Sequence, residues 1–278
     1  MTYASGTLES SQTPRGQSSN ALLELRNISK HFGPVQCLTD VDLSVPAGKV
    51  TALVGDKGAG KSSLVKCIAG IYAPDAGEIF FEGKHVKMRS PKDAGDLGIE
   101  TVYQDLALCD NLDIVQNMFL GRERTKWRML NEVSMEKSAK ETLASLSVTT
   151  VQSIRQPVAS LSGGQRQAVA VAKAVMWNAK IVILDEPTAA LGVAQTRMVL
   201  DLVLRLAKNG LGVILISHNM NDVFEVADRI AVLRLGRLVT QDNVDMFDRQ
   251  IVVDLMTTGI STRSANTNRS INDIKVEE

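Results

Sequence analysis

The alternation of apolar and polar residues predicts where strands and helices lie along the chain. Between positions 21 and 45 the two kinds alternate, which is typical of half-buried strands in an antiparallel sheet. Positions 49–54, 181–184 and 213–216 are short, almost entirely apolar runs, typical of strands buried on both faces. After each run, apolar residues recur at the spacing of one helix face: Leu64, Cys67, Ile68 and Ile71; Val199, Leu202, Val203 and Leu206; Val223, Phe224 and Ala227. Strands that alternate with helices predict an α/β fold with a largely parallel sheet, which binds ligands at the carboxyl ends of its strands.

A region of mixed polar and apolar residues interrupts this rhythm from about 99 to 165, and we interpret it as an inserted helical subdomain. Its clearest helix is predicted at about 134–146, with one apolar side. That side consists of Met135, Leu143 and Leu146. The basic run Arg122–Arg128 around Trp127 is typical of a solvated face, with contact to lipid headgroups or nucleic acid as the alternative.

The remaining segments complete a predicted main domain at about 21–260. Positions 78–81 are a predicted strand after a Pro-Asp-Ala-Gly turn signal, and positions 229–239 are a predicted terminal hairpin. Residues 1–20 contain too few apolar side chains to order themselves, and residues 261–278 are polar. We therefore expect a disordered tail before the domain and a frayed polar tail after it.

Composition and charge argue against several classes of protein. The 278 residues, 44% of them hydrophobic, allow one large α/β domain with an insertion. Equal numbers of basic and acidic residues, 31 each, give no overall field that would recruit nucleic acid or an anionic membrane. The apolar runs are too short to cross a bilayer, and the N-terminus lacks the apolar core of a signal peptide. The dispersed Cys37, Cys67 and Cys109 are predicted to be reduced thiols, so we expect a cytosolic protein that is soluble or peripherally membrane-bound.

The most specific motif is a glycine-rich loop between the strand at 49–54 and the helix that follows it. It fits the phosphate-binding pattern G-x-x-x-x-G-K-[ST] with Gly55, Asp56, Lys57, Gly58, Ala59, Gly60, Lys61 and Ser62. The glycines let successive N–H groups point inward, and the helix dipole adds to this nest for phosphate oxygens. Lys61 is placed to bind the β- and γ-phosphates of a nucleotide, and Ser62 supplies a hydroxyl for Mg²⁺. The next residue, Ser63, is included in the predicted nucleotide site.

Asp185 and Glu186 directly follow the apolar run at 181–184. A carboxylate at the end of such a strand can hold Mg²⁺, and a second one beside it can polarise water toward the γ-phosphate as a general base. An ordinary acidic turn is the alternative. The phosphate-binding loop upstream favours the catalytic interpretation.

The segment Leu161–Gln165 is a second specific signal. Ser162 and Gln165 have the spacing of a capping box, which predicts the start of a helix. The box does not explain Gly163 and Gly164, which cost about 1 kcal/mol each relative to alanine unless the backbone must approach something closely. We therefore expect a second phosphate-binding surface at this helix start.

Five elements together resemble, in order and rough spacing, the ATP-binding subunits of ABC transporters, over about Leu22 to Gly259. They are the glycine loop, Gln104, the signature Leu161–Gln165, Asp185–Thr188 and Ser217-His218. The resemblance implies a P-loop NTPase of the ABC ATPase type, with an antiparallel β subdomain and an inserted helical subdomain. It also implies two such domains arranged head to tail, each ATP lying between the glycine loop of one and the signature of the other. Because this chain has one loop and one signature, the resemblance implies a homodimer or a pair with a similar subunit.

The resemblance also assigns roles to the matching residues. The implied roles are Mg-ATP binding for Lys61, Ser62 and Asp185; water activation for Glu186; γ-phosphate contact for His218; metal contact and communication with the membrane subunit for Gln104; adenine stacking for Phe32; and completion of the opposing site for Ser162, Gly163, Gly164 and Gln165. Two positions depart from the family pattern. Gly192 stands where the family usually has Asp, and Lys57 stands where Asn or Ser is more common.

Positions 98–108 and 117–123 further resemble the simple-sugar importers of the ribose, fructose and xylose group. Many of those proteins fuse two cassettes, whereas this chain is similar to the single-cassette form. The resemblance implies an ATPase that powers sugar uptake, bound peripherally at the cytoplasmic face of the cell membrane. Its implied partners are membrane-spanning permease subunits and, indirectly, a sugar-binding protein, with no nucleic acid.

Two rival interpretations remain open at this stage. An ABC ATPase of DNA repair would carry a long coiled coil between its halves, but only about 100 residues separate Lys61 from Ser162 and no heptads are sustained there. An ABC ATPase of translation normally carries two cassettes in one chain. A P-loop kinase or GTPase is the second rival, and the signature has no role in such a protein.

Overall fold

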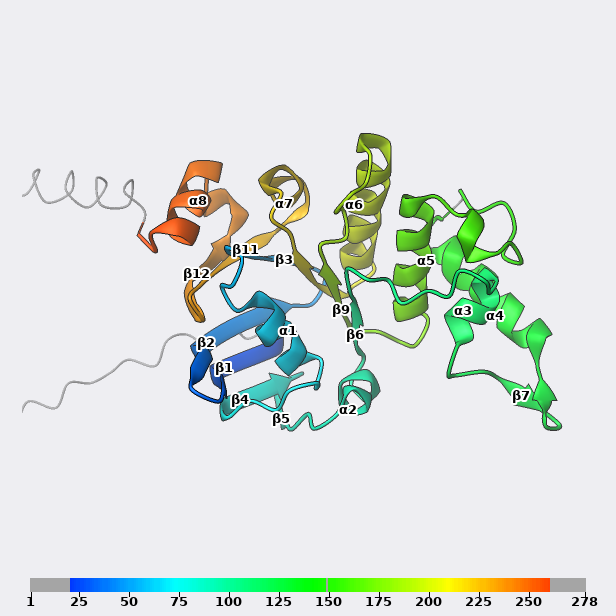
Figure 1. Cartoon of the computed structure of the whole chain (residues 1–278), viewed down its shortest axis with the longest axis horizontal. Coiled ribbons are helices and arrows are strands. Elements are labelled where there is room, and N and C mark those ends of the chain that lie inside the picture. Colours follow the sequence, from blue (N-terminus) through cyan, green and yellow to red (C-terminus); the bar gives the residue numbers. More distant parts are fainter. Residues whose placement is uncertain (1–20, 149, 261–278) are drawn as a thin grey trace, which may run out of the picture.

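The computed structural model describes residues 21–148 and 150–260, which form three adjoining parts (Figure 1). A six-stranded sheet forms the centre, a four-stranded antiparallel sheet lies at the lower left of the view, and a helical lobe lies at the right. The tails predicted at 1–20 and 261–278 lie outside the described residues. No helix in the described ranges is both long enough and apolar enough to span a bilayer.

The central sheet has the strand order β12-β11-β3-β10-β9-β6, in which all neighbours are parallel except β11 and β12. Its strands are β3 (Val50–Val54), β6 (Ile99–Val102), β9 (Ile181–Asp185), β10 (Gly212–Ile216), β11 (Arg229–Arg234) and β12 (Arg237–Asn243). Every residue of β3 and β10 is buried, which confirms that these apolar runs are strands covered on both faces. In β9, Ile181 and Ile183 face one core and Val182 and Leu184 face another.

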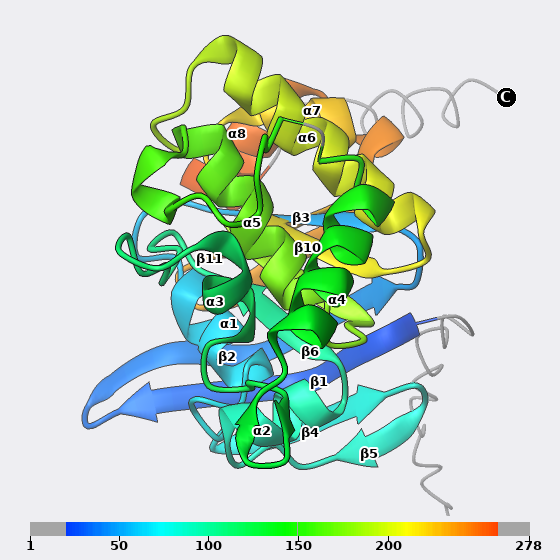
Figure 2. The ribbon, with the colours of Figure 1, turned by 90° about the vertical axis from the view of Figure 1, so that its right-hand side faces the viewer.

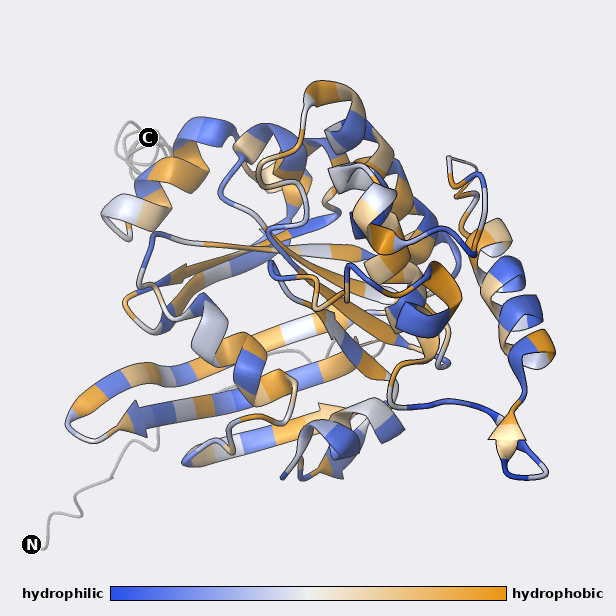
Figure 3. Cartoon of the chain, turned by 45° about the vertical axis from the view of Figure 1, so that its right-hand side comes forward, coloured by the Kyte–Doolittle hydropathy of each residue, from blue (hydrophilic) through white to orange (hydrophobic). Residues whose placement is uncertain are grey.

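Helices and the second sheet cover the two faces of the central sheet. Helix α1 (Lys61–Ile68) and the antiparallel sheet cover one face, and helices α5 (Gly163–Val175) and α6 (Val193–Lys208) cover the other. Helices α7 (Met220–Val226) and α8 (Arg249–Thr257) pack over β3 and β11. The four residues predicted to form the apolar face of α6 are buried: Val199, Leu202, Val203 and Leu206. Figure 3 shows the resulting pattern, with hydrophobic strands in the middle and polar helix faces outside.

The antiparallel sheet confirms the alternating pattern of the N-terminal region. Its order is β2-β1-β4-β5, formed by β1 (Ala21–Phe32), β2 (Val35–Pro46), β4 (Ala76–Phe81) and β5 (Lys84–Val86). Leu23, Leu25 and Ile28 are buried in β1, in contact with the core under α1. This sheet therefore packs against α1, the helix that follows the glycine loop.

The helical lobe faces the viewer in Figure 2. It contains α3 (Ile114–Phe119), α4 (Glu132–Ser145), the 3₁₀ turn η1 (Val158–Ser160), α5, and a hairpin of β7 (Thr125–Lys126) and β8 (Met129–Leu130); α2 (Pro91–Asp96) precedes β6. The predicted apolar side of α4 is confirmed, because Met135, Leu143 and Leu146 are buried. The second half of the basic run lies in the hairpin, whose turn residue Trp127 is 85% exposed, as expected for a solvated face.

Three expectations about local structure were wrong. Positions 99–102 are not helical but form β6, an edge strand of the central sheet, because Ile99 and Val102 are buried against the parallel neighbour β9. Helix α1 ends at Ile68, so Ile71 lies beyond it and is 42% exposed. The hairpin at 229–239 is not terminal, because η2 (Val244–Met246) and α8 follow it, and α8 packs on the sheet through buried residues.

Candidate functional site

One open cavity of about 1050 Å³ lies where β3, β9 and β10 end. It brings together the following predicted site residues: Gly55, Asp56, Lys57, Gly58, Ala59, Gly60, Lys61, Ser62, Ser63, Gln104, Asp185, Glu186 and His218. They come from the four segments that follow β3, β6, β9 and β10 at the carboxyl edge of the parallel strands, which is where such sheets bind ligands. The predicted clustering of these loops is therefore observed.

The glycine loop has a backbone that only glycine accommodates at its tightest points. Gly58 and Gly60 have φ angles of 85° and 104°, in the region that side chains disfavour. At Gly55 a Cβ atom would lie 2.2 Å from the carbonyl oxygen of Leu233, a backbone atom that cannot swing aside. Helix α1 then begins at Lys61, and its N-cap residue Gly60 has no side chain to cap it, which leaves the first N–H groups of the helix uncapped beside the cavity.

Lys61 lies across this loop. Its Nζ donates to the carbonyl oxygens of Gly55 and of Asp56, the latter at 3.0 Å. Burial lowers the pKa of the Lys61 ammonium, against the opposing attraction of Glu186, Asp56 and Asp185. An ammonium that is partly removed from water attracts an anionic group more strongly than one in bulk water.

Asp185 ends β9, and its carboxyl group is half-buried. Burial raises the pKa of Asp185, the neighbouring Glu186 carboxylate raises it further, and Lys61 and Lys66 oppose both effects. A nearby positive charge stabilises the ionised form of such a carboxylate, which makes it a suitable ligand for a metal cation.

Glu186 is paired with His218. Glu186 Oε2 lies 2.7 Å from His218 Nδ1, although the imidazole is 74% exposed. The backbone of Glu186 has a left-handed φ of 51°, and its N–H donates to the carbonyl oxygen of Ile216 at 2.9 Å. The carboxylate is thus held at the mouth of the cavity by the next loop of the sheet.

The signature segment forms the predicted capping box at the start of α5. Ser162 Oγ accepts a hydrogen bond from the Gln165 N–H at 3.4 Å, and Gln165 Oε1 accepts one from the Ser162 N–H at 2.9 Å. The two glycines have an explanation within the chain. A Cβ atom on Gly164 would lie 2.7 Å from Met198 Cε, and one on Gly163 would lie 2.9 Å from Leu191 Cδ2. None of the five signature residues Leu161–Gln165 lines the cavity of its own chain.

Phe32 does not line the cavity, but it pairs across the β1–β2 ladder with Val35, which does. Its ring packs edge-to-face on Tyr72, with centroids 4.9 Å apart, and is 40% exposed. Several residues that do line the cavity had not been expected from the sequence: Val35, Gln36, Cys37, Ala189, Ile216, Leu235, Gly236 and Met256. Most come from the start of β2, from the β11–β12 turn and from α8, and no motif marks them.

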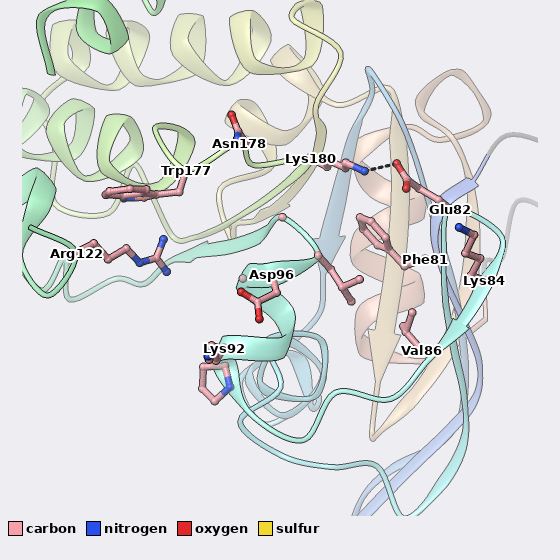
Figure 4. Close-up of a pocket in the computed structure, with 14 residues that line it drawn as sticks. Phe81, Glu82, Lys84, Val86, Lys92, Asp96, Arg122, Trp177, Asn178 and Lys180 are labelled. Atoms are coloured by element: carbon pink, nitrogen blue, oxygen red, sulfur yellow. Dashed lines mark hydrogen bonds and ion pairs between the residues drawn. The ribbon is translucent and has the colours of Figure 1, made fainter. Parts of the chain in front are cut away.

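A second cavity of about 950 Å³ lies between the antiparallel sheet and the helical lobe (Figure 4). Arg122 and Trp177 line it on the lobe side, whereas Phe81 and Glu82 line it on the sheet side, where Glu82 forms an ion pair with Lys180 at 2.7 Å. Arg122 and Trp177 also line an adjoining cavity of about 320 Å³ that includes Leu106 and Leu120. We call this adjoining cavity the lobe groove. Its walls include residues 100–107 apart from Gln104, which itself lines the first cavity.

The family model of the ABC transporter matches residues 38–189 of the chain, which contain the glycine loop, the signature and the two carboxylates. The chain belongs to the ABC transporter family, as an ATP-binding subunit. It is 49% identical to the fructose import ATP-binding protein FrcA of Rhizobium meliloti, over 85% of this chain and 94% of that protein. It is 48% identical to the xylose/arabinose import ATP-binding protein XylG of Sulfolobus acidocaldarius, with the same two shares covered.

The fold is also that of solved ABC cassettes. The dimeric structure of a post-hydrolysis state of the cassette MJ0796, bound to ADP and Pi, superposes with a TM-score of 0.66. It is 25% identical, and the match covers 80% of this chain and 98% of that one. The expected P-loop NTPase fold of the ABC ATPase type is thereby confirmed.

Proposed function

We propose that this chain is the ATP-hydrolysing subunit that energises the import of a simple sugar, acting at the cytoplasmic face of the cell membrane. The observation that carries the enzymatic part is the single cavity that joins the glycine loop, Asp185 and the Glu186–His218 pair. The assignment to sugar import rests on the similarity to FrcA and XylG over 85% of the chain. A function in DNA repair or translation has no comparable support.

The proposed nucleotide is ATP with Mg²⁺. Lys61 and the open N–H groups at the start of α1 bind its phosphates. The oxygen donors of Ser62, Gln104 and Asp185 line the same cavity, and oxygen ligands of this kind suit Mg²⁺. When bound, the metal neutralises charge on the transferred phosphoryl group.

Within that site the chain's own residues activate the attacking water and position the nucleotide. Glu186 accepts a proton from the attacking water, as a general base at the end of β9. His218 contacts the γ-phosphate and holds the Glu186 carboxylate in place through the 2.7 Å contact. Phe32 is proposed to stack on adenine, next to the turn residues that line the cavity.

We further propose that two copies, or this chain and a similar subunit, form two composite sites. Ser162, Gly163, Gly164 and Gln165 do not line the cavity of their own chain, although a helix N-terminus with a serine hydroxyl favours phosphate. A second chain placed head to tail brings this helix start to the open side of the cavity. The dimeric cassette MJ0796 with ADP and Pi is a precedent for pairing in this family.

The lobe groove is the proposed contact with a membrane-spanning permease. Its edge from Thr101 to Ala107 flanks Gln104, so that movement of this segment links the metal site to the groove. A sugar-binding protein is an indirect partner through the permease, and no nucleic acid is involved.

The proposal is tested by gently solubilising membranes from cells that express the tagged chain and identifying what co-purifies. We expect a multi-span membrane protein. Leu120→Glu places a charge in the lobe groove, whereas Leu204→Glu alters a similarly exposed leucine on α6, at 44% against 43%. The first variant should lose the membrane protein and the second should keep it, with ATP binding unchanged in both. Ribosomes or nucleic acid in place of a membrane protein would support the alternative function.

A further inference from the structure

We propose that Asp222 is a positioning residue for ATP hydrolysis: its buried carboxylate ties the loop after β9 to the loop after β10 and so fixes Glu186 against His218. The proposal rests on the roles proposed above for these two residues. Asp222 lies in the first turn of α7 and does not line the nucleotide cavity.

Asp222 is only 5% exposed, and among the described residues no other Asp, Glu, Lys, Arg or His side chain is as fully buried. Burying a carboxylate is unfavourable unless strong hydrogen bonds compensate for the lost water. Two such bonds are present. Thr188 Oγ1 donates to Asp222 Oδ2 at 2.6 Å, and Asn219 Nδ2 donates to Asp222 Oδ1 at 2.9 Å.

These two donors belong to the two loops that hold the proposed catalytic pair. Thr188 follows Glu186 by two residues, and Asn219 directly follows His218. The Glu186 N–H also bonds to the carbonyl oxygen of Ile216, at the end of β10. Together with the Glu186–His218 contact, the Asp222 carboxylate therefore closes a ring of polar links between the loops.

The loop after β9 requires such support. Glu186 and Ala190 both have left-handed backbones, with φ angles of 51° and 60°, a conformation that residues with a Cβ atom adopt at an energetic cost. It persists only where the surroundings hold it. His218 is largely exposed, so packing alone does not orient its ring. Thr188, two residues after Glu186, anchors this loop through its hydrogen bond to the buried carboxylate of Asp222.

A simple capping function for Asp222 does not account for these contacts. A carboxylate at this third helical position usually accepts a hydrogen bond from the backbone N–H of the capping residue, here Asn219. That N–H instead donates to Ser217 Oγ at 3.0 Å, and Asn219 caps α7 with its own side chain. Asp222 is consequently free to accept from Thr188, which is 34 residues away in sequence.

The test compares Thr188→Val, which keeps the side-chain shape and removes the donor, with Thr188→Ser, which keeps the donor. Misplacing catalytic groups by about 1 Å can cost about 100-fold in rate. We expect Thr188→Val to lower kcat about 10- to 100-fold with unchanged affinity for ATP, and Thr188→Ser to stay within about 3-fold of wild type. Thr188→Ala serves as a second donor-free variant if the valine chain does not fold, and thermal unfolding checks both.

A double-mutant cycle with His218→Ala separates a positioning effect from a general loss of stability. If Asp222 acts through the catalytic pair, Thr188→Val should add little to the loss already caused by His218→Ala. Independent, multiplied losses would overturn the inference. A folded Thr188→Val chain with normal kcat would also overturn the inference. If His218→Ala alone still lowers kcat strongly, the proposed role of His218 stands without the positioning role of Asp222. Full activity in His218→Ala would instead contradict the proposed role of His218 and the inference with it.

Discussion

The glycine loop and the signature each form the start of a helix, and their structures differ. The glycine loop before α1 has left-handed glycines and no side-chain cap, so its N–H groups open onto a cavity with Lys61 and two carboxylates. The signature before α5 has a complete capping box, and its glycines allow close packing on residues from 191 to 198. The first segment thus has a full set of partners for a nucleotide within its own chain. The signature has its helix cap and its packing partners within the chain. In the proposed mechanism it binds the nucleotide held by another chain.

The largest expected effect is at the signature. Ser162→Arg introduces a long cation at a helix start that does not line the cavity of its own chain. If sites are composite, hydrolysis should be abolished although the glycine loop is untouched. Phosphate release and binding of a fluorescent ATP analogue measure this on the purified chain. A variant that hydrolyses ATP normally would show that one chain suffices.

Glu186→Gln, in the cavity of the glycine loop, should have the next largest effect on ATP hydrolysis. Removing a general base lowers turnover about 10²–10⁴-fold, whereas the neutral amide leaves the glycine loop and Lys61 in place. ATP binding should therefore persist while turnover falls. Near-normal hydrolysis would mean that another residue activates the water.

The two kinds of glycine can be distinguished by their stability effects. At Gly55 a methyl group meets a backbone carbonyl oxygen at 2.2 Å, whereas at Gly164 it meets the flexible end of Met198 at 2.7 Å. We expect Gly55→Ala to cost about 3 kcal/mol in the free energy of unfolding and Gly164→Ala about 1 kcal/mol. Urea unfolding measures both. Combining Gly164→Ala with Met198→Ala should remove part of the cost if contact with that side chain is the cause, and an undiminished cost would contradict this explanation.

The smallest expected effect is a pH-dependent change at Asp185. Its pKa is raised in the folded chain, chiefly by burial, so the ionised carboxylate is less favourable folded than unfolded. Asp185→Asn should therefore stabilise the nucleotide-free chain at pH 7. The gain should shrink as pH falls through the raised pKa and vanish below about pH 4, where the carboxyl group is protonated in both states. Urea titrations at several pH values test this, and a destabilised variant at pH 7 would contradict it.

The motif residues could be predicted from the sequence because their spacing reflects local backbone requirements. The glycine loop, the buried strands and the capping box each follow from a few neighbouring residues. β6 was missed because an edge strand with Glu100 and Thr101 between its buried ends looks neither alternating nor continuous. α8 is not predicted, because the hairpin at 229–239 is expected to be the last regular element of the domain.

Long-range contacts left no signal in the sequence. The hydrogen bond between Thr188 and Asp222 joins the loop after β9 to α7, two segments that neither motif nor periodicity connects. The same holds for the cavity walls contributed by Val35, Leu235 and Met256, which come from β2, the β11–β12 turn and α8. The sequence pattern of Gly163 and Gly164 indicates a ligand, whereas the structure shows that packing on Leu191 and α6 already accounts for the close approach.

The composite site, the central claim, is tested most directly by mixing two inactive chains. One carries Ser162→Arg with an intact glycine loop, and the other carries Lys61→Ala with an intact signature. Mixed dimers contain one site in which both parts are intact, so ATP hydrolysis should reappear on mixing although each chain alone is inactive. If light scattering shows that mixed dimers form and hydrolysis stays at background, the signature does not complete the site of a second chain.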